Sequence, residues 1–470
     1  MMANKALAAF YYPEGIAVIG ASRNPGKAGY QVVKNLTQGS YNGPVYPVNP
    51  AVGDVLGHKC YPSLGSIEGR VSLIIITTPA DQVVDIFREA ARRGDVRAAI
   101  VVSAGFSETK DPAKIAMEKE FLALAGQAGI RILGPNCTGV INTANGLDTT
   151  IEPTVAQTRG GISIYSQSGA MGGSILLFME DQPVPLGFNK WTHSGNTCDL
   201  DVIDVLEYYG ADPGTETILL YTEAINKGRQ FMELARQIAP RKTILVLKVG
   251  RTELGVKAAY SHTGALAGSN QVYEAAFRKC GVLRMLNLEE MVDTAKALAM
   301  QPLPRGNRIC ILTEAGGPGT IAMDELGTSP LVTLAEISPA GQQRLHGVVP
   351  PISIVCQPQG YIDITAAAME EHHARALQCV LEEDGVDGVI LLSVPPTYLK
   401  PESLAGAIIE AVRGYNKPVL TCLLAGQWVR EARRMLEAAG LPTYATPDRA
   451  ARAMINMVQR QEYLRGLEVK

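Results

Sequence analysis

The sequence predicts an α/β protein with three doubly wound domains, each built on a mostly parallel sheet. Short runs of β-branched residues are repeatedly followed by a glycine-rich turn and then by a helical pattern, which is typical of successive β–α units. The chain has 470 residues, which is too long for one hydrophobic core. We therefore expect several domains of the same general class.

The composition excludes several functional classes. The chain is 46% hydrophobic and 19% charged, with a formal net charge of -3, as in an ordinary soluble globular protein. No apolar run approaches the roughly 18 residues of a membrane span, and the N-terminal stretch lacks the apolar core of a signal peptide. We expect a cytoplasmic protein that binds neither nucleic acid nor membrane. The eight cysteines are widely spaced, so neither a disulfide framework nor a metal site is expected.

Three domains follow from the order of strands and turns. The first, residues 1–143, contains five strand-then-turn units and ends in "IRILGPNCTGVIN". A polar passage over 143–159 without clear periodicity is interpreted as a linker. The second domain, 158–300, opens with "GGISIYSQSGAMGG", and the proline-containing run at 301–307 marks its end. The third, 307–470, opens with "RICILTEAGGPGT", and this similar opening suggests an internal structural repeat.

The first glycine-rich turn, "GASRNPGKAGY", suits a phosphate-rich nucleotide better than a nicotinamide cofactor. Ser22 stands where a dinucleotide fingerprint has its second glycine, and Asn49 follows the second strand where an acidic residue would hold a ribose. A dehydrogenase is therefore disfavoured. Arg23 and Lys27 can neutralise phosphates that the backbone cradles. The alternative is a tight turn that merely exposes basic residues.

Two further turns have the same two interpretations. In "SQSGAMGG", Ser168 and Gly169 lie at an expected helix start, where free N–H groups and the helix dipole favour an anion. A structural N-cap is equally consistent with these residues. In "EAGGPGT" (314–320), glycines that allow close packing of strand and helix are the favoured interpretation.

His262 lies in "SHTGALAG", among small and hydroxyl-bearing neighbours. A neutral imidazole can accept a phosphoryl group, and these neighbours bring neither bulk nor negative charge against it. Zinc binding is not expected, since no His or Cys lies at ligand spacing. The alternative is a lone loop histidine that hydrogen-bonds to the backbone.

Taken in order, "VIGASRNPGKAG", "VYPVNP", "SAGFSE", "GPNCTGVIN", "SQSGA", "HSGN", "SHTGALAG" and "GGPG" resemble the α subunit of the ADP-forming acetate–CoA ligases. These acid–thiol ligases belong to the nucleoside-diphosphate-forming acyl-CoA synthetase superfamily, together with succinyl-CoA synthetase. The resemblance covers nearly the whole chain. It implies a Rossmann-like CoA-binding domain followed by two flavodoxin-like succinyl-CoA ligase domains.

The resemblance also implies a reaction: acyl-CoA, ADP and phosphate are interconverted with a carboxylic acid, CoA and ATP. The intermediates would be an acyl phosphate and a phosphohistidine on His262, with acetate or another small acid as substrate. Ser168 and Gly169 match the helix start that binds phosphate in the family. Glu223, in "LLYTEAI", matches a glutamate that orients the imidazole; from the residues alone, it would be a surface carboxylate at a strand end.

The CoA site that the resemblance implies is spread over five strand ends. Its residues would be Gly20, Ser22, Arg23, Lys27, Val48, Asn49, Pro50, Thr78, Pro79, Ala80, Ser103, Ala104, Gly105, Asn136 and Cys137. The last two would lie near the thioester. Cys137 is interpreted as a packing or lining residue, because no histidine is near it in the sequence to make it a nucleophile.

Nothing in the chain resembles the ATP-grasp domains of the superfamily, and no G-x-x-x-x-G-K-[ST] loop replaces them. We therefore expect a separate ATP-grasp β subunit, in an α₂β₂ assembly, that brings ADP or ATP and Mg²⁺. Two departures affect the substrate preference: "GYID" (360–363) replaces the family's "NPVD", and Cys198 stands at a position usually occupied by another residue. The alternative function is a catalytically inactive CoA-sensing or regulatory protein of the same fold.

Overall fold

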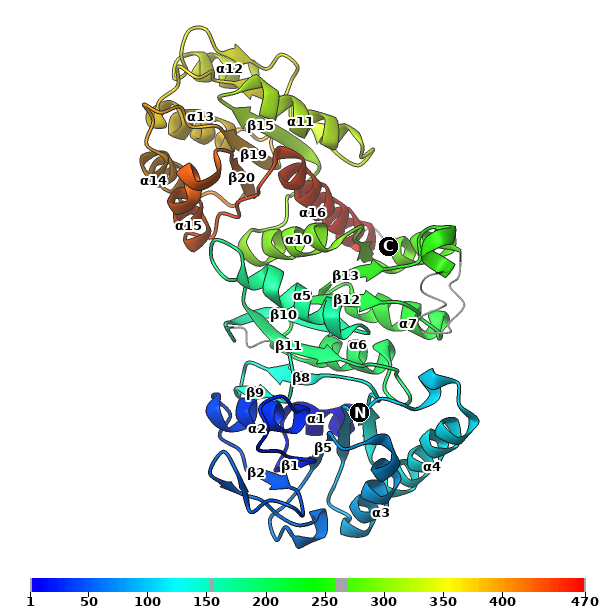
Figure 1. The fold of residues 1–470 in the computed structure, drawn as a ribbon. Coiled ribbons are helices and arrows are strands. Elements are labelled where there is room, and N and C mark those ends of the chain that lie inside the picture. The colour runs from blue at the N-terminus through cyan, green and yellow to red at the C-terminus, as the bar shows by residue number, and fades with distance from the viewer. Residues whose placement is uncertain (1, 153–155, 258–268, 469–470) are drawn as a thin grey trace. The chain divides into compact units, whose positions relative to one another are not determined.

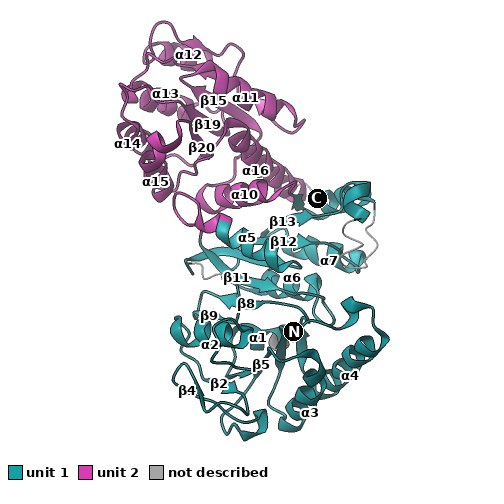
Figure 2. Ribbon diagram, in the orientation of Figure 1, with its two compact units in different colours: residues 1–177, 187–284 teal, residues 178–186, 285–470 magenta. Residues whose placement is uncertain are grey.

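The computed structural model describes residues 2–152, 156–257 and 269–468 (Figure 1). The chain forms two compact units (Figure 2), namely unit 1 with residues 1–177 and 187–284, and unit 2 with residues 178–186 and 285–470. Unit 1 contains two large sheets and unit 2 contains one. The expected α/β class is confirmed. No helix in the described ranges is both long enough and apolar enough to cross a membrane.

The first sheet has five parallel strands in the order β2–β1–β5–β6–β7. Its strands are β2 (Val45–Val48), β1 (Ile16–Ile19), β5 (Leu73–Ile76), β6 (Ala98–Val101) and β7 (Arg131–Leu133). Its helices are α1 (Met2–Tyr11), α2 (Ala28–Gln38), α3 (Val83–Arg93) and α4 (Pro112–Ala128), and β3 (Asp54–Val55) and β4 (His58–Lys59) form a small hairpin. The strand order reverses direction between β1 and β5. In such sheets, a crevice for ligands opens at this point, outside the carboxyl ends of the strands.

Local sequence explains where these elements begin and end. All residues of β1, β5 and β6 are buried, as their continuous apolar runs predict for strands covered on both faces. Helix α4 begins after Asp111, whose carboxylate accepts the main-chain N–H of Ala113 at 2.8 Å. It ends at Gly129, whose φ of 68° lies in the left-handed region that glycine tolerates.

The second sheet has seven strands in the order β14–β13–β12–β10–β11–β8–β9. They are β14 (Val282–Arg284), β13 (Thr243–Lys248), β12 (Thr217–Thr222), β10 (Arg159–Ser166), β11 (Phe188–His193), β8 (Gly139–Asn142) and β9 (Leu147–Asp148). The helices are α5 (Gly169–Glu180), α6 (Val202–Ala211), α7 (Gly228–Ile238) and α9 (Asn270–Cys280).

Strands β8 and β9 were not expected in this sheet. The sequence predicted that "GVIN" closes the first domain and that 143–159 is a linker, but β8 pairs antiparallel with β11 and β9 pairs antiparallel with β8. Both strands are buried. The linker interpretation is therefore wrong over β9. A strand of two residues is too short to produce any periodicity in the sequence.

Unit 2 contains the third sheet, in the order β17–β18–β15–β19–β20, with β16 paired to β15. Its strands are β15 (Arg308–Thr313), β16 (Thr333–Leu334), β17 (Ile354–Val355), β18 (Tyr361–Asp363), β19 (Gly388–Ser393) and β20 (Val419–Leu423). Its helices are α10 (Leu288–Met300), α11 (Gly316–Gly327), α12 (Pro339–His346), α13 (Glu370–Glu382), α14 (Pro401–Ala411), α15 (Arg430–Ala438) and α16 (Pro447–Glu468). Only β17 runs antiparallel to its neighbour among these strands.

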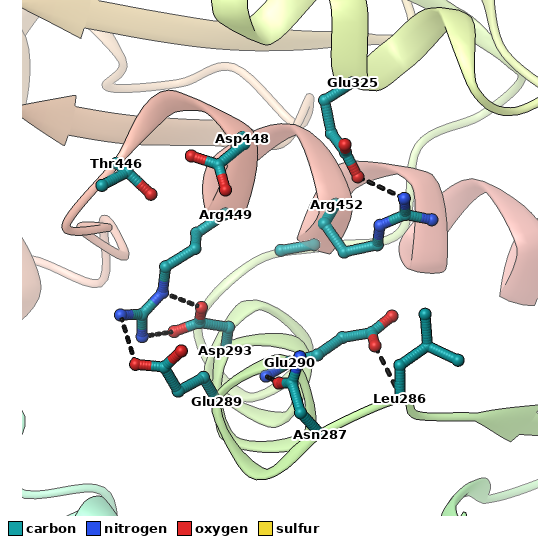
Figure 3. Close-up of a pocket in the computed structure, with 11 residues that line it drawn as sticks. Leu286, Asn287, Glu289, Glu290, Asp293, Glu325, Thr446, Asp448, Arg449 and Arg452 are labelled. Atoms are coloured by element: carbon teal, nitrogen blue, oxygen red, sulfur yellow. Dashed lines mark hydrogen bonds and ion pairs between the residues drawn. The ribbon is translucent and has the colours of Figure 1, made fainter. Parts of the chain in front are cut away.

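Charged side chains join α10, α11 and α16 around a cavity of about 450 Å³ (Figure 3). Arg449 on α16 donates to Asp293 on α10 at 2.6 and 2.9 Å, and Arg452 pairs with Glu325 on α11. Asp293 is almost fully buried, so its carboxylate depends on this partner. Because these charges pair with one another, we interpret the cavity as part of the packing of unit 2.

Candidate active site

The turn after β1 approaches its neighbours so closely that it requires glycine. A Cβ on Gly20, whose φ is +91°, would lie 2.8 Å from the Thr77 hydroxyl oxygen. A Cβ on Gly29 would lie 2.1 Å from the Gly20 carbonyl oxygen. Helix α2 therefore starts directly against the turn, an arrangement that lets a ligand's phosphates approach main-chain N–H groups.

The basic residues of this turn lie at the surface. Arg23 is more than half exposed; it pairs with the Asp54 carboxylate and donates from Nε to the Asp54 carbonyl oxygen at 2.9 Å. Lys27 is the N-cap residue of α2 and makes no side-chain capping bond. The Ser22 hydroxyl accepts the main-chain N–H of Asn24 at 3.0 Å, which orders the loop between them.

The strand ends beside this turn are tied to it by side chains. Asn49, after β2, donates to the Ala21 carbonyl oxygen at 2.7 Å. Ser103, after β6, donates to the Thr78 carbonyl oxygen after β5 at 2.5 Å. The carboxyl ends of β1, β2, β5 and β6 thus bring together the expected CoA residues Gly20, Ser22, Arg23, Lys27, Val48, Asn49, Pro50, Thr78, Pro79, Ala80, Ser103, Ala104 and Gly105.

The last two expected CoA residues differ in exposure. Asn136 is exposed, and its side-chain amide donates to the Asn196 side-chain oxygen at 3.3 Å. Cys137 is only 2% exposed and points its thiol at the Val101 carbonyl oxygen, 3.3 Å away. Burial raises the pKa of this thiol to about 12, so it stays protonated at neutral pH. The structure supports a packing role for Cys137.

The turn between β10 and α5 contains Ser168 and Gly169. A Cβ on Gly169 would lie 3.0 Å from Cε1 of His193, so this helix start also packs closely against a side chain. The Ser168 hydroxyl lies 3.4 Å from the main-chain N–H of Met171, a weak version of the expected capping contact. The positive end of the α5 dipole lies at this turn.

Glu223 is placed beside this turn by one side chain, Gln167. The Oε1 atom of Gln167 lies within hydrogen-bond distance of three donors on the segment that follows β12: the Thr222 hydroxyl at 2.8 Å, the Glu223 N–H at 2.6 Å and the Ala224 N–H at 3.1 Å. Glu223 itself is 9% exposed. The structure thus brings the main chain of Glu223 next to the residue that precedes the expected phosphate-binding turn.

A buried lysine near Glu223, Lys248, has a second buried cation, Arg284, close to it. Lys248, at the end of β13, is the register partner of Thr222 and donates to the Val249 carbonyl oxygen at 2.7 Å. Burial and the nearby Arg284 guanidinium lower its pKa to about 8, while Glu223 opposes that shift. The Arg284 side chain is only 8% exposed. Lys248 therefore brings a cation close to Glu223 at the carboxyl edge of the second sheet, while Arg284 pairs with Glu274.

His262 lies outside the described residues. Its flanks are described: the chain leaves β13 at Lys248 and enters α9 at Asn270. Both positions belong to the same part of unit 1 as Glu223, because Lys248 pairs in register with Thr222 and Arg284 contacts the Asn270 carbonyl oxygen at 3.4 Å. The last described strand before His262, β13, thus ends at the same carboxyl edge of the sheet as β12, which Glu223 follows.

Sequence reasoning missed three residues of this region. Gln167 stands inside the "SQSG" motif, and its polar side chain directly after a buried strand is the signal that indicates it. His193, to which the sequence assigns no role, contacts the turn through the Gln167 carbonyl oxygen, 3.2 Å from its Nε2. Lys248 ends a buried strand after the apolar run Ile244–Leu247, and a charged residue at that position is the available signal.

Two family models match the chain: "CoA binding domain" over residues 14–143 and "Succinyl-CoA ligase like flavodoxin domain" over residues 159–298. The chain is similar to the α subunit of acetate–CoA ligase [ADP-forming] II of Pyrococcus furiosus, with 40% identity over 97% of this chain and 98% of that one. It is 30% identical to the 4-hydroxybutyrate–CoA ligase [ADP-forming] of Nitrosopumilus maritimus over 97% of this chain, but spans only 64% of that longer enzyme.

A solved structure shows the same fold. The dinucleotide-forming acetyl-coenzyme A synthetase 1 of Ca. Korarchaeum cryptofilum, in complex with phosphate and ADP, matches with a TM-score of 0.90 and 33% identity over 98% of both chains. The resemblance noted from the motifs is confirmed. The relatives and the two family models together show that this chain is an acid–thiol ligase component that belongs to the family of ADP-forming acetate–CoA ligases, as a counterpart of their α subunits.

Proposed function

We propose that this chain interconverts acyl-CoA, ADP and phosphate with a carboxylic acid, CoA and ATP, through an acyl phosphate and a phosphohistidine on His262. The observation that carries the proposal is the placement of Glu223. Gln167 holds the main chain of Glu223 beside the turn that starts α5, at the carboxyl edge of the sheet where β13, the last described strand before His262, also ends. A carboxylate and an anion-binding helix start are what a phosphoryl-carrying imidazole needs on its two sides.

In the first half-reaction, a phosphate oxygen attacks the thioester carbonyl carbon, the C–S bond breaks, and CoA leaves as a thiolate that takes up a proton. The imidazole nitrogen of His262 then attacks phosphorus, the bond between phosphorus and the acyl oxygen breaks, and the carboxylate leaves. Ser168 and Gly169 at the start of α5 bind the phosphate. Glu223 orients the imidazole and stabilises its positive charge, the role that a carboxylate has beside a catalytic histidine.

CoA binds at the carboxyl edge of the first sheet in this proposal. The close approach of Gly29 to Gly20 brings the positive start of α2 against this turn, where it favours the phosphates, and Arg23 and Lys27 lie at the surface beside it. The side chain of Asn136 donates to that of Asn196, which follows β11 of the second sheet. We assign Asn136 to the thioester end of the ligand. The acid is acetate or another small carboxylic acid.

The second half-reaction needs a partner. An oxygen of the ADP β-phosphate attacks the phosphohistidine, the P–N bond breaks, and ATP is formed. We propose that an ATP-grasp β subunit binds ADP with Mg²⁺ and assembles with this chain as α₂β₂. Two relatives support a separate partner subunit. The Pyrococcus furiosus relative is itself an α subunit, and this chain spans only 64% of the longer Nitrosopumilus maritimus enzyme. We further propose three domains, 1–143, 158–300 and 307–470, each containing most strands of one large sheet; β8 joins the second sheet from the end of the first domain.

The first half-reaction gives a test that needs no partner. The chain is incubated with acetyl-CoA and radiolabelled phosphate, and the label is mapped by peptide mass spectrometry. We expect an acid-labile, alkali-stable label on His262, which partner subunit and ADP then convert into labelled ATP. His262→Ala should bind CoA as the wild type does and take up no label. A wild-type chain that binds CoA but takes up no label would instead support the CoA-sensing alternative, which the named relatives do not favour.

A further inference from the structure

The turn that starts α5 has a counterpart in the third sheet. In unit 1, Gln167 follows β10, and its Oε1 accepts the Thr222 hydroxyl and the Glu223 N–H that follow β12. In unit 2, Glu314 follows β15, and its Oε1 accepts the Ser393 hydroxyl at 2.9 Å and the Val394 N–H that end β19. Both sheets thus use a side-chain oxygen to hold the end of the adjacent parallel strand.

The two turns differ in charge. The amide of Gln167 is neutral. Glu314 is a carboxylate, 2% exposed, and its second oxygen contacts Nε2 of the fully buried His373 at 2.9 Å. In unit 2, His373 is therefore the partner of the negative charge that Glu314 brings to the turn after β15. In unit 1, the same position carries no charge, next to the place where the proposed phosphate binds.

We propose that Gln167 is the positioning residue of this active site, holding Glu223 against the phosphate-binding turn through Oε1 while adding no negative charge there. This role rests on the proposed function, because it acts through Glu223 and on the phosphate. The main-chain ladder between β10 and β12 ends at the pair Ser166 and Tyr221. Beyond that pair, the Gln167 side chain takes over the hydrogen bonds that join the two segments.

Gln167 is itself fixed from two directions. Its main-chain N–H donates to the Tyr221 carbonyl oxygen at 3.1 Å, and its carbonyl oxygen accepts Nε2–H of His193 at 3.2 Å. A side chain whose backbone is held on both sides can keep its acceptor oxygen in one place. Three donors converge on that oxygen, so its removal would leave two main-chain N–H groups of a catalytic segment without this acceptor.

Two substitutions separate geometry from charge. Gln167→Met removes the acceptor at similar length, whereas Gln167→Glu keeps an acceptor oxygen and adds the charge that unit 2 carries at Glu314. Gln157→Met is the matched control, because the Gln157 amide also makes a side-chain hydrogen bond in unit 1, to Asp148 at 3.2 Å. The readouts are the saturating rate of His262 labelling from acetyl-CoA and radiolabelled phosphate, the KM for phosphate, and the thermal midpoint of each variant.

We expect Gln167→Met to lower the saturating rate about thirtyfold or more, with a KM for phosphate within about threefold of the wild type. Gln167→Glu should keep the rate within about threefold and raise the KM for phosphate about tenfold, because of like-charge repulsion. In a Glu223→Gln background, Gln167→Met should lower the labelling rate by no more than about a further threefold. Both substitutions remove the contribution of the positioned Glu223 carboxylate, so their effects should not add. Gln157→Met should label at the wild-type rate.

Three results would overturn the positioning role while His262 still labels in the wild type: an unchanged rate in Gln167→Met, equal rate losses in Gln167→Met and Gln167→Glu, or full additivity with Glu223→Gln. If Gln167→Met and Gln167→Glu lose the labelling rate equally and both have a lowered thermal midpoint, Gln167 contributes only to the stability of the fold. A wild-type chain without label overturns the proposed function, and the role of Gln167 with it.

Discussion

His193 accepts the main-chain N–H of Thr138 at its Nδ1 atom, 2.9 Å away. Since Nδ1 is an acceptor, the proton of the neutral ring lies on Nε2, which donates to the Gln167 carbonyl oxygen. One imidazole therefore joins the start of β8, the end of β11 and the turn before α5. Burial lowers its pKa to about 4, so the ring is neutral at physiological pH.

This histidine should make stability depend on pH. Its pKa is about 4 in the folded chain and 6.5 as an ordinary imidazole, so the unfolded chain binds the proton more tightly. Its stabilising contribution is complete above pH about 6.5 and decreases as the pH falls toward 4. Between pH 7 and 5, we expect the wild type to lose about 2 kcal/mol more unfolding free energy than His193→Asn. Denaturant unfolding at both pH values measures this, and equal losses would contradict the assigned protonation.

Gly169→Ala should disturb the phosphate-binding turn. The added Cβ would lie 3.0 Å from Cε1 and 3.3 Å from Nδ1 of His193, closer than ordinary packing allows. We expect a loss of about 1–3 kcal/mol in unfolding free energy and slower His262 labelling, with CoA affinity unchanged. Gly126→Ala is the control, because nothing lies within 4 Å of its added Cβ on α4 and alanine favours the helix. A Gly169→Ala protein as stable and active as Gly126→Ala would refute the close contact.

Arg23→Ala should weaken CoA binding about tenfold, because a charge-assisted contact to phosphate is lost. Arg70→Ala is the matched control: it is an exposed arginine of the same unit, paired with Glu14 away from the β1 turn. Calorimetric titration with CoA at low and high salt should show a reduced salt dependence for Arg23→Ala alone. Equal affinities for the two variants would remove Arg23 from the CoA site.

Cys137→Ala should keep the labelling rate within about threefold and cost about 1 kcal/mol of unfolding free energy, since the thiol is a packing group. Its high pKa and burial also predict that Cys137 reacts with iodoacetamide only in denaturant. Mass spectrometry of the intact protein and of its peptides, with and without denaturant, measures whether Cys137 has been alkylated. Complete loss of labelling in a folded Cys137→Ala protein would show a chemical role for the thiol.

Arg449→Met should destabilise unit 2 strongly, because it leaves the buried Asp293 carboxylate without its cation (Figure 3). We expect a cost of about 3 kcal/mol, whereas the exposed pair of Arg465 and Glu462 should contribute less than about 1 kcal/mol when Arg465→Met breaks it. Adding Asp293→Leu to Arg449→Met should recover most of the loss. Equal losses of unfolding free energy in Arg449→Met and Arg465→Met would show that the ion pair of Arg449 and Asp293 does not stabilise unit 2.

The β-branched runs and glycine turns determined the three large sheets, because strands buried on both faces have continuous apolar sequences. The family resemblance implied that Gly20, Asn49, Thr78 and Ser103 belong to one site, and the parallel strands that precede them do end at one edge of a sheet. The motif order was sufficient to place the chain in its family. These inferences needed only local patterns and the known geometry of β–α units.

Only the tertiary structure decided which strands are neighbours. Gln167 and Glu223 are 56 residues apart, and they meet because β10 pairs with β12, a pairing that no local pattern reports. The same is true of β8, which joins the second sheet beside β11 and brings Thr138 to His193. Hydrogen bonds between distant side chains depend on strand order and register, and these are set by packing of the whole sheet rather than by any one segment.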